Sequence, residues 1–400
     1  MLKKIKSERY VWIDVTFTLL ALELMAYFYY GIRTLVTAGI CIAVSLIAEL
    51  IFLRFTHRKF TADDLTCTSD ALIAALMVPA VIDYKIPAIA CVFAVIAAKN
   101  IFGGRRNMIF SPAAVAYVFI LASWKKELLS YPAPHDKADI LDSAAELTNS
   151  ATYVFNHTGS MNYTDFELLL GNFSGPIGAV SILLLIVAAV ILILRRDISW
   201  GAFVGTVAGT GFMAYFCPIA SNSILSVKYV FATNMILFAA IYIISDLRIA
   251  PKRNYYAFFY GFFIAISSYV LMITTGQENI IVIMSVLFTP LSLAFKNLQK
   301  RIDNEKLLEA EAAAEAVLEA EVTAAEEAVA ETEDKADIEA VETEGTENSE
   351  EEVSEEEAIS SDDESEEAEA VTEEVPSDTE TEQEEPAAEE EKAEGDDSDE

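Results

Sequence analysis

Long apolar runs, separated by short charged segments, dominate the first 300 residues of the chain. A helix needs about 20 apolar residues to cross the roughly 30 Å hydrocarbon layer of a bilayer. Inside lipid, each backbone N–H and C=O must find a partner within the protein, which a helix provides along its own length. The sequence therefore predicts an all-α fold: a polytopic membrane helix bundle in a lipid bilayer.

Ten candidate spans are expected, of which the third, fourth and fifth are short enough to be tilted or partly re-entrant. The expected spans are about 11–30, 34–53, 70–83, 86–99, 109–124, 176–194, 200–217, 227–244, 255–274 and 279–295. With the N-terminus inside, the inside segments hold 18 Lys and Arg residues and the outside segments hold six. This bias follows the positive-inside rule and predicts that both termini are cytoplasmic.

Charge divides the chain into two parts. Residues 1–300 hold 23 basic and 18 acidic residues, whereas residues 301–400 hold 4 basic and 44 acidic residues. The first part is expected to be the transmembrane domain, with its longest extracytoplasmic loop at about 125–175. The second part has almost no large apolar residues to offset chain entropy, which predicts an acidic, low-complexity, disordered cytoplasmic tail that is partly helical at its start. Such composition offers no basic surface for nucleic acid.

The usual signatures of a self-contained soluble enzyme are missing from the sequence. It contains no P-loop, no G-x-G-x-x-G and no nucleophile elbow, and we predict neither a catalytic residue nor a metal site. The cysteines and histidines are scattered singly, so that they form no CxxC motif or metal-ligand cluster. They are Cys41, Cys67, Cys91, Cys217, His57, His135 and His157.

Four local motifs stand out from generic membrane composition. The first, at 98–114, places Gly103 and Gly104 before a short basic stretch and a Ser-Pro-Ala helix start. The second, at 171–181, reads GNFSGPIGAVS, and the third, at 195–200, reads RRDISW. The fourth, at 245–251, reads SDLRIAP and contains Asp246 and Arg248. In plainer readings, the glycine pair makes a tight turn, and Asp246 caps a helix or pairs with a nearby arginine.

In their order and spacing, these motifs resemble the D subunit of the Rnf-type ion-translocating electron transport complex. That subunit is related to the B subunit of the sodium-pumping NADH:quinone oxidoreductase. The resemblance covers roughly residues 5–300 and marks the chain as a divergent member, with ten spans as the count the family implies. It implies a bacterial cytoplasmic (inner) membrane protein that works with the other subunits of an Rnf-like complex.

The resemblance implies electron transfer between ferredoxin and NAD, coupled to Na⁺ or H⁺ translocation. Gly103, Gly104, Asp246 and Arg248 would then lie at the cytoplasmic edge of the path, near a bound cofactor or at subunit contacts. As one subunit of several, the chain would show little turnover alone, so whether it is an enzyme by itself stays open.

Family members carry FMN on a threonine in a motif like D-x-x-S-G-A-T-x-L, attached by a separate flavin transferase. The corresponding segment here, at 146–154, reads ELTNSATYV and lies in the expected extracytoplasmic loop. The resemblance therefore implies covalent FMN on Thr152 and a flavin transferase as a partner. The alternative is an ordinary loop threonine.

Two other functions remain open. Because Asn149 and Ser150 replace the Ser-Gly pair of the anchor motif, the chain can also be a flavin-free structural or transport paralogue of the subunit. A third reading is an unrelated secondary transporter, which predicts flux by the purified protein and inverted repeats between 11–124 and 176–295. A charge run like the acidic tail usually serves only to solvate the chain. The alternative hypothesis is that the tail repels anionic lipid and docks a basic cytoplasmic partner.

Overall fold

The computed structural model describes residues 11–61, 64–104, 108–137, 140 and 147–342. Contacts between residues divide the chain into two units, 1–320 and 321–400. The fold described here is that of the first unit. The predictions for residues 343–400, which form most of the acidic tail, lie outside the described residues.

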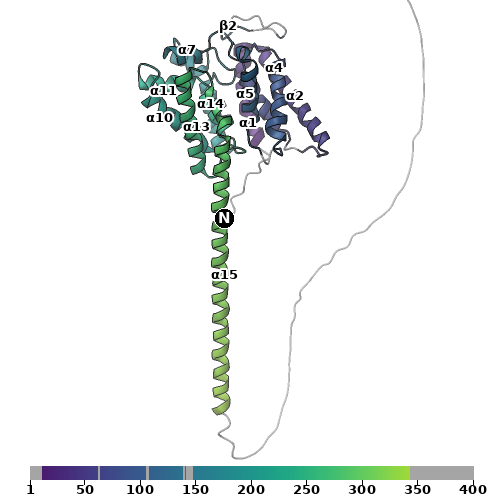
Figure 1. Cartoon of the computed structure of the whole chain (residues 1–400), viewed down its shortest axis with the longest axis vertical. Helices are drawn as coiled ribbons and strands as arrows, with labels where there is room; N and C mark the ends of the chain where they lie inside the picture. Colours follow the sequence, from purple (N-terminus) through teal and green to yellow (C-terminus); the bar gives the residue numbers. More distant parts are fainter. Residues whose placement is uncertain (1–10, 62–63, 105–107, 138–139, 141–146, 343–400) are drawn as a thin grey trace, which may run out of the picture. The chain divides into compact units, whose positions relative to one another are not determined.

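The first group of helices is purple and blue in Figure 1, where α1, α2, α4 and α5 lie together. Its elements are α1 (Val11–Tyr30), α2 (Ile32–Phe55), α3 (Thr66–Leu76), α4 (Lys85–Phe93), η2 (Ala94–Asn100) and α5 (Pro112–Ser123). The π-helix η2 continues α4. Helix α5 begins after Ser111, whose hydroxyl accepts the Ala114 N–H as a helix cap, with Pro112 at the first helical position.

A connecting segment of short elements follows. They are α6 (Lys125–Leu128), β1 (Tyr131–Pro132), β2 (Leu147–Thr148), α7 (Ala151–Thr158) and α8 (Asp165–Leu170). The strands pair antiparallel, with Tyr131 opposite Thr148 and Pro132 opposite Leu147. Ser150 caps the N-terminus of α7, and Thr164 and Glu167 form a capping box on α8.

The second group, teal and green in Figure 1, contains the remaining helices. They are α9 (Ile182–Arg195), α10 (Trp200–Phe216), α11 (Ser223–Ala232), α12 (Ile236–Ala239), η4 (Ala240–Ile244), α13 (Asn254–Thr275), α14 (Ile280–Leu287) and α15 (Thr289–Glu342). Helix α15 begins in the first unit and continues beyond residue 320.

The helices confirm a helical membrane fold but differ from several expected spans. In the described part of the chain, α1, α2 and α13 are long and apolar enough to cross a membrane, and bent pairs of helices raise this number to at most five. The expected span 70–83 is helical only to Leu76, and the helix of span 176–194 starts only at Ile182. The count of ten spans stays a prediction.

Two breaks account for the bent pairs. Helix α11 meets the continuous segment of α12 and η4 at an angle of 62°, because Asn234 and Met235 adopt left-handed backbone angles with φ near 56° and 55°. At α14 and α15 the bend is 43°, and it coincides with Pro290, which has no N–H to continue the helical ladder. A broken helix is tolerated at membrane depth where protein surrounds it.

Helices α10 and α13 pack against each other through glycines. Gly201, Gly205 and Gly209 recur every fourth residue on α10, and a Cβ at each would press on a backbone carbonyl of α13. At Gly205 this Cβ would overlap the carbonyl oxygen of Phe258, and Gly261 of α13 approaches Ala202 in the same way. Small residues at this spacing let two membrane helices approach closely, so the glycines fix the contact.

We expect Gly205→Ala to destabilise the purified protein by about 1–3 kcal/mol, the usual cost of overpacking a close contact. Thermal unfolding in detergent measures this change. Gly211→Ala is the matched control on the same helix, because its Cβ would meet only the Phe231 ring at 3.8 Å. Equal midpoints for the two variants would show that the α10–α13 contact is looser than described.

Candidate functional site

Polar contacts hold both ends of the helix bundle. The loop end carries the connecting segment, where Arg33 donates to the Ile140 carbonyl at 3.1 Å and Lys125 reaches Gln277 at 3.4 Å. We call the opposite end the turn end, because it contains the turns around Ser199 and Ser245. There the Ser199 N–H donates to the Ser245 carbonyl at 2.8 Å.

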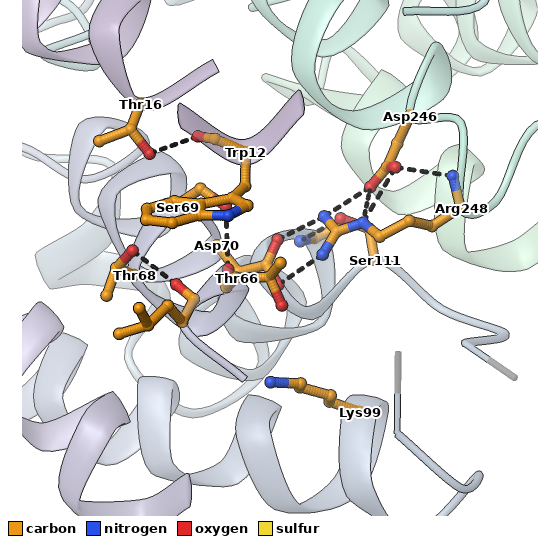
Figure 2. Close-up of polar contacts among 12 residues, drawn as sticks. Trp12, Thr16, Thr66, Thr68, Ser69, Asp70, Lys99, Ser111, Asp246 and Arg248 are labelled. Carbon is orange, nitrogen blue, oxygen red and sulfur yellow. Dashed lines mark hydrogen bonds and ion pairs between the residues drawn. The ribbon is translucent and has the colours of Figure 1, made fainter. Parts of the chain in front are cut away.

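The turn end contains a cluster of one arginine and two aspartates, in which Asp70 is buried and Asp246 and Arg248 are partly buried. Figure 2 shows the Arg248 guanidinium between Asp70 and Asp246. Its Nη1 and Nη2 lie 2.9 and 2.5 Å from the two carboxylate oxygens of Asp70. Its Nε lies 2.8 Å from Asp246 Oδ2, and its Nη2 lies 2.6 Å from the same oxygen. Such two-pronged pairing fixes both position and orientation of the three groups.

The local sequence explains how these groups meet. Asp70 lies on α3, and the segment after η4 turns back because the Ile249 and Ala250 N–H groups donate to the Asp246 carbonyl. Asp246 also forms an isolated β-bridge with Ile198. Lys296 of α15 donates to the Arg248 carbonyl at 2.9 Å. The cluster therefore joins α3 of the first group to three segments of the second.

A second buried ion pair lies in the first group. Lys99 Nζ is 3.0 Å from Glu49 Oε1, and the side-chain amide of Asn100 donates to Glu49 Oε2 at 3.0 Å. Lys99 and Glu49 are each 1% exposed. Both donors lie on η2, and π-helical turns often occur at functional positions because they redirect side chains.

Gly103 and Gly104 follow this pair in a tight turn with φ of 98° and 79°. Their N–H groups donate to the carbonyls of Asn100 and Lys99, so the turn closes on η2. In the described residues, the structure thus brings Asp246 and Arg248 together and places the two glycines beside Lys99 instead. A Cβ at Gly104 would meet open space.

Three buried acids were missed in the sequence. Asp70 is paired with Arg248, Glu49 with Lys99, and Glu23 on α1 is 2% exposed beside Thr34. Each lies within or beside an apolar run, and an ionisable residue in such a run usually faces a partner or a pathway. That signal was available from the sequence, whereas the identity of the partners was not.

Thr152 lies at the loop end, on the first turn of α7. Its side chain is buried, at 3% exposed, and its Oγ1 accepts the backbone N–H of Asn234 at 3.1 Å. The side-chain amides of Asn156 and Asn234 exchange two hydrogen bonds of 3.0 Å beside it. Thr152 therefore ties α7 to the break between α11 and α12.

Glu278 holds the start of α7 from the other side. The Ser150 hydroxyl donates to Glu278 Oε2 and accepts the Tyr153 N–H at 2.8 Å. Burial raises the pKa of the Glu278 carboxyl from its ordinary value of 4.5 to about 6, although Ser150, His157 and Lys125 act in the opposite direction. The carboxyl therefore titrates in mildly acidic solution.

The folded α7 does not fit a flavin on Thr152. A phosphoester at Oγ1 would need this oxygen at the surface with room for a flavin, but the oxygen is buried and holds the Asn234 N–H. Attachment would require α7 to leave its position. Among the described residues, moreover, no group of three or more His, Cys, Asp or Glu side chains is placed to hold a metal ion.

We expect Arg248→Gln to destabilise the protein by about 3–5 kcal/mol, because removing one partner leaves buried charge uncompensated. The thermal midpoint in detergent measures this loss. Arg253→Gln is the control: Arg253 also pairs with an aspartate, Asp303, but both side chains are about 40% exposed. An exposed pair contributes less than about 1 kcal/mol. A similar small loss for Arg248→Gln would contradict the pairing of Arg248 with the buried Asp70.

Glu278 predicts a pH dependence of stability. Because its folded pKa is raised to about 6, the folded protein binds this proton more tightly than the unfolded chain does. The stabilisation is complete below about pH 4.5, and it falls by about 2 kcal/mol as the pH rises to 6 and just above. We expect Glu278→Gln to remove this decline from thermal unfolding curves.

The control for this prediction is Glu127→Gln, which changes an exposed carboxyl of the same connecting segment. This variant should keep the decline of the unmodified protein. A decline that is unchanged in Glu278→Gln would mean that the Glu278 carboxyl is not buried.

Comparison with known proteins gives the following relationships. The family described as "NQR2, RnfD, RnfE family" matches residues 2–294. The D subunit of the Na(+)-translocating ferredoxin:NAD(+) oxidoreductase complex of Acetobacterium woodii is 28% identical over 188 residues, which cover 47% of this chain and 58% of the relative. The D subunit of the ion-translocating oxidoreductase complex of Actinobacillus pleuropneumoniae is 29% identical over 160 residues, covering 40% and 45%.

A third relative is matched over a longer stretch. The D subunit of the ion-translocating oxidoreductase complex of Ectopseudomonas mendocina is 25% identical over 267 residues, which cover 62% of this chain and 78% of the relative. The chain spans 58% and 45% of the lengths of the first two relatives. Since the family match extends over most of the chain and includes both groups of helices, the chain belongs to the NQR2, RnfD, RnfE family.

Proposed function

We propose that this chain is a membrane subunit of an Rnf-like electron transport complex. In this complex, electron transfer between ferredoxin and NAD is coupled to the translocation of Na⁺ or H⁺ across a bacterial inner membrane. The proposal is supported by the family match and by relatives named as D subunits of ion-translocating oxidoreductase complexes. The other subunits of the complex are its proposed partners.

The structural observation that carries the proposal is ionisable side chains buried among apolar helices. A charge within the membrane is costly and is kept where it pairs with another charge or serves an ion pathway. Arg248 and Lys99 compensate Asp70 and Glu49. Glu23, in contrast, has no basic partner among the described side chains, and its Oε1 accepts no hydrogen bond there.

This contrast assigns different roles to the acids. Asp70 and Glu49 position helices, because each is held by two donors. Glu23 is the carboxyl that is available to a passing cation or proton, since the neighbouring Thr34 occupies only part of its binding capacity. In this proposal the loop end faces the outside of the cell and the turn end faces the cytoplasm.

Replacing Glu23 by Gln tests the proposal, because the amide keeps the shape of the side chain and removes its charge. We expect ferredoxin-dependent ion uptake by inverted vesicles that contain the whole complex to fall by about tenfold or more, equivalent to at least about 1.4 kcal/mol. Complex assembly should stay unchanged. Asp165→Asn, which alters an exposed ion pair with Lys228, is the control with full uptake. Normal uptake with Glu23→Gln would contradict this role.

The second candidate function is a flavin-free form of the subunit, and the position of Thr152 favours it. The resemblance implies FMN on Thr152, attached by a flavin transferase, but the Thr152 hydroxyl is buried and hydrogen-bonded in the folded loop. This burial supports the flavin-free alternative, in which the chain serves the complex as a structural or transport subunit. Bound FMN would supply one-electron and two-electron chemistry that side chains lack.

Flavin fluorescence of the denatured protein in a gel separates the two forms. The protein is expressed with its flavin transferase, and peptides from the 125–175 loop are analysed by mass spectrometry. The flavin-free form predicts a dark band and an unmodified Thr152. A fluorescent band with an FMN adduct on Thr152, lost in Thr152→Ala, would establish the flavin-bearing form.

A further inference from the structure

Helix α7 lies between two irregular points of the second group of helices. On one side it contacts the break between α11 and α12 at Asn234, and on the other it contacts the α13–α14 turn at Glu278. Figure 1 shows α7 close to the ends of α11, α13 and α14. The short helix α7 thus touches two places where one helix of the second group ends and the next begins.

The break at Asn234 needs support from outside its own helix. Asn234 and Met235 both have positive φ, a backbone conformation that residues other than glycine rarely adopt and that costs free energy. The Asn234 N–H is buried and has left the helical ladder, so it requires an acceptor. That acceptor is Thr152 Oγ1, at 3.1 Å.

Asn156, one turn further along α7, adds specific contacts. Its amide exchanges two hydrogen bonds of 3.0 Å with the amide of Asn234. Its Nδ2 also donates to the Gln277 carbonyl at 3.2 Å, in the α13–α14 turn. One side chain of α7 therefore binds both irregular points at once.

The α13–α14 turn is held by Ser150 and by close packing. Ser150 donates to Glu278, and at Gly276 an added Cβ would lie 3.3 Å from the His157 ring. We name the set of Ser150, Thr152, Asn156, Asn234 and Glu278 the α7 clasp. Its members come from three segments that are far apart in the sequence.

We propose that Thr152 is a positioning residue of the α7 clasp, whose hydroxyl oxygen fixes the α11–α12 break in its bent form. In this proposal the Thr152 hydroxyl oxygen serves as the acceptor of this hydrogen bond and not as the point of attachment of a cofactor. While the clasp is closed, a modifying enzyme has no access to the oxygen. The inference rests on these contacts alone and holds whether or not the complex transfers electrons.

A cysteine reporter at the break tests the proposal. Met235, which is 3% exposed, is replaced by Cys in a protein whose exposed Cys217 is changed to Ser. The three remaining cysteines are buried. Labelling by a polar maleimide is followed in detergent-purified full-length protein, where both ends of the bundle are accessible to the reagent.

In this background, Thr152→Val keeps the shape of the side chain and removes the acceptor. We expect the rate of labelling at the reporter to rise by about tenfold or more, because local opening becomes easier. Thr152→Ser keeps the acceptor and should restore slow labelling. Thr158→Val is the matched control, since it removes an exposed hydroxyl from the same helix and should leave the rate unchanged.

Equal labelling rates for the reporter protein with Thr152 and for the same protein with Thr152→Val would overturn the proposal. An FMN adduct on Thr152 in the mass spectrum of the purified protein would also overturn it. If the Met235→Cys variant does not fold, the thermal unfolding midpoints of proteins that keep Met235 test the proposal instead. The midpoint must then fall in Thr152→Val and recover in Thr152→Ser. A midpoint that is the same in all three proteins would equally exclude the role. None of these measurements depends on electron transfer.

Discussion

A charge inside an apolar interior is stable only with a partner, and this constraint organises the first unit of the chain. Arg248 satisfies it for Asp70 and Asp246, and Lys99 satisfies it for Glu49. Since it costs free energy to remove each charged group from water, separating any of these pairs would leave a buried charge without compensation and destabilise the fold. The cluster of Arg248, Asp70 and Asp246 therefore specifies which segment of the second group faces α3.

At the opposite end, hydrogen bonds between uncharged groups hold the α11–α12 break. The α11–α12 break leaves backbone groups without helical partners, and α7 supplies an acceptor through Thr152 and an amide pair through Asn156. Between the two ends, the glycines of α10 bring α13 close enough for backbone contact. Charge pairs, neutral hydrogen bonds and close glycine packing thus act at different depths of the helix bundle.

Much of the architecture could be predicted from the apolar runs, because their length and the charges between them indicate membrane helices. The motifs at 98–114, 171–181, 195–200 and 245–251 identified the family correctly. The plain interpretation of Asp246, that it pairs with a nearby arginine, agrees with its contact with Arg248. The other half of this cluster could not be predicted, since Asp70 lies 178 residues away in the sequence.

The α11–α12 break and the burial of the Thr152 hydroxyl could not be predicted from the sequence either. Residues 233–235 read Thr-Asn-Met, and no proline or glycine marks the 62° bend there. The motif around Thr152 indicates a loop threonine, but whether its hydroxyl faces solvent depends on Asn234, which lies 82 residues away. The apolar runs indicate which parts of the chain are helical, whereas such contacts depend on the whole fold.

The central claim is that Arg248 couples the two groups of helices by binding Asp70. A double-mutant cycle with Asp70→Asn and Arg248→Gln, read from thermal unfolding of the purified protein, tests it most directly. If the two side chains bind each other, the second substitution should cost at least about 1 kcal/mol less once the first is present. Losses that simply add would contradict the claim, because they would show that each residue stabilises the protein independently of the other.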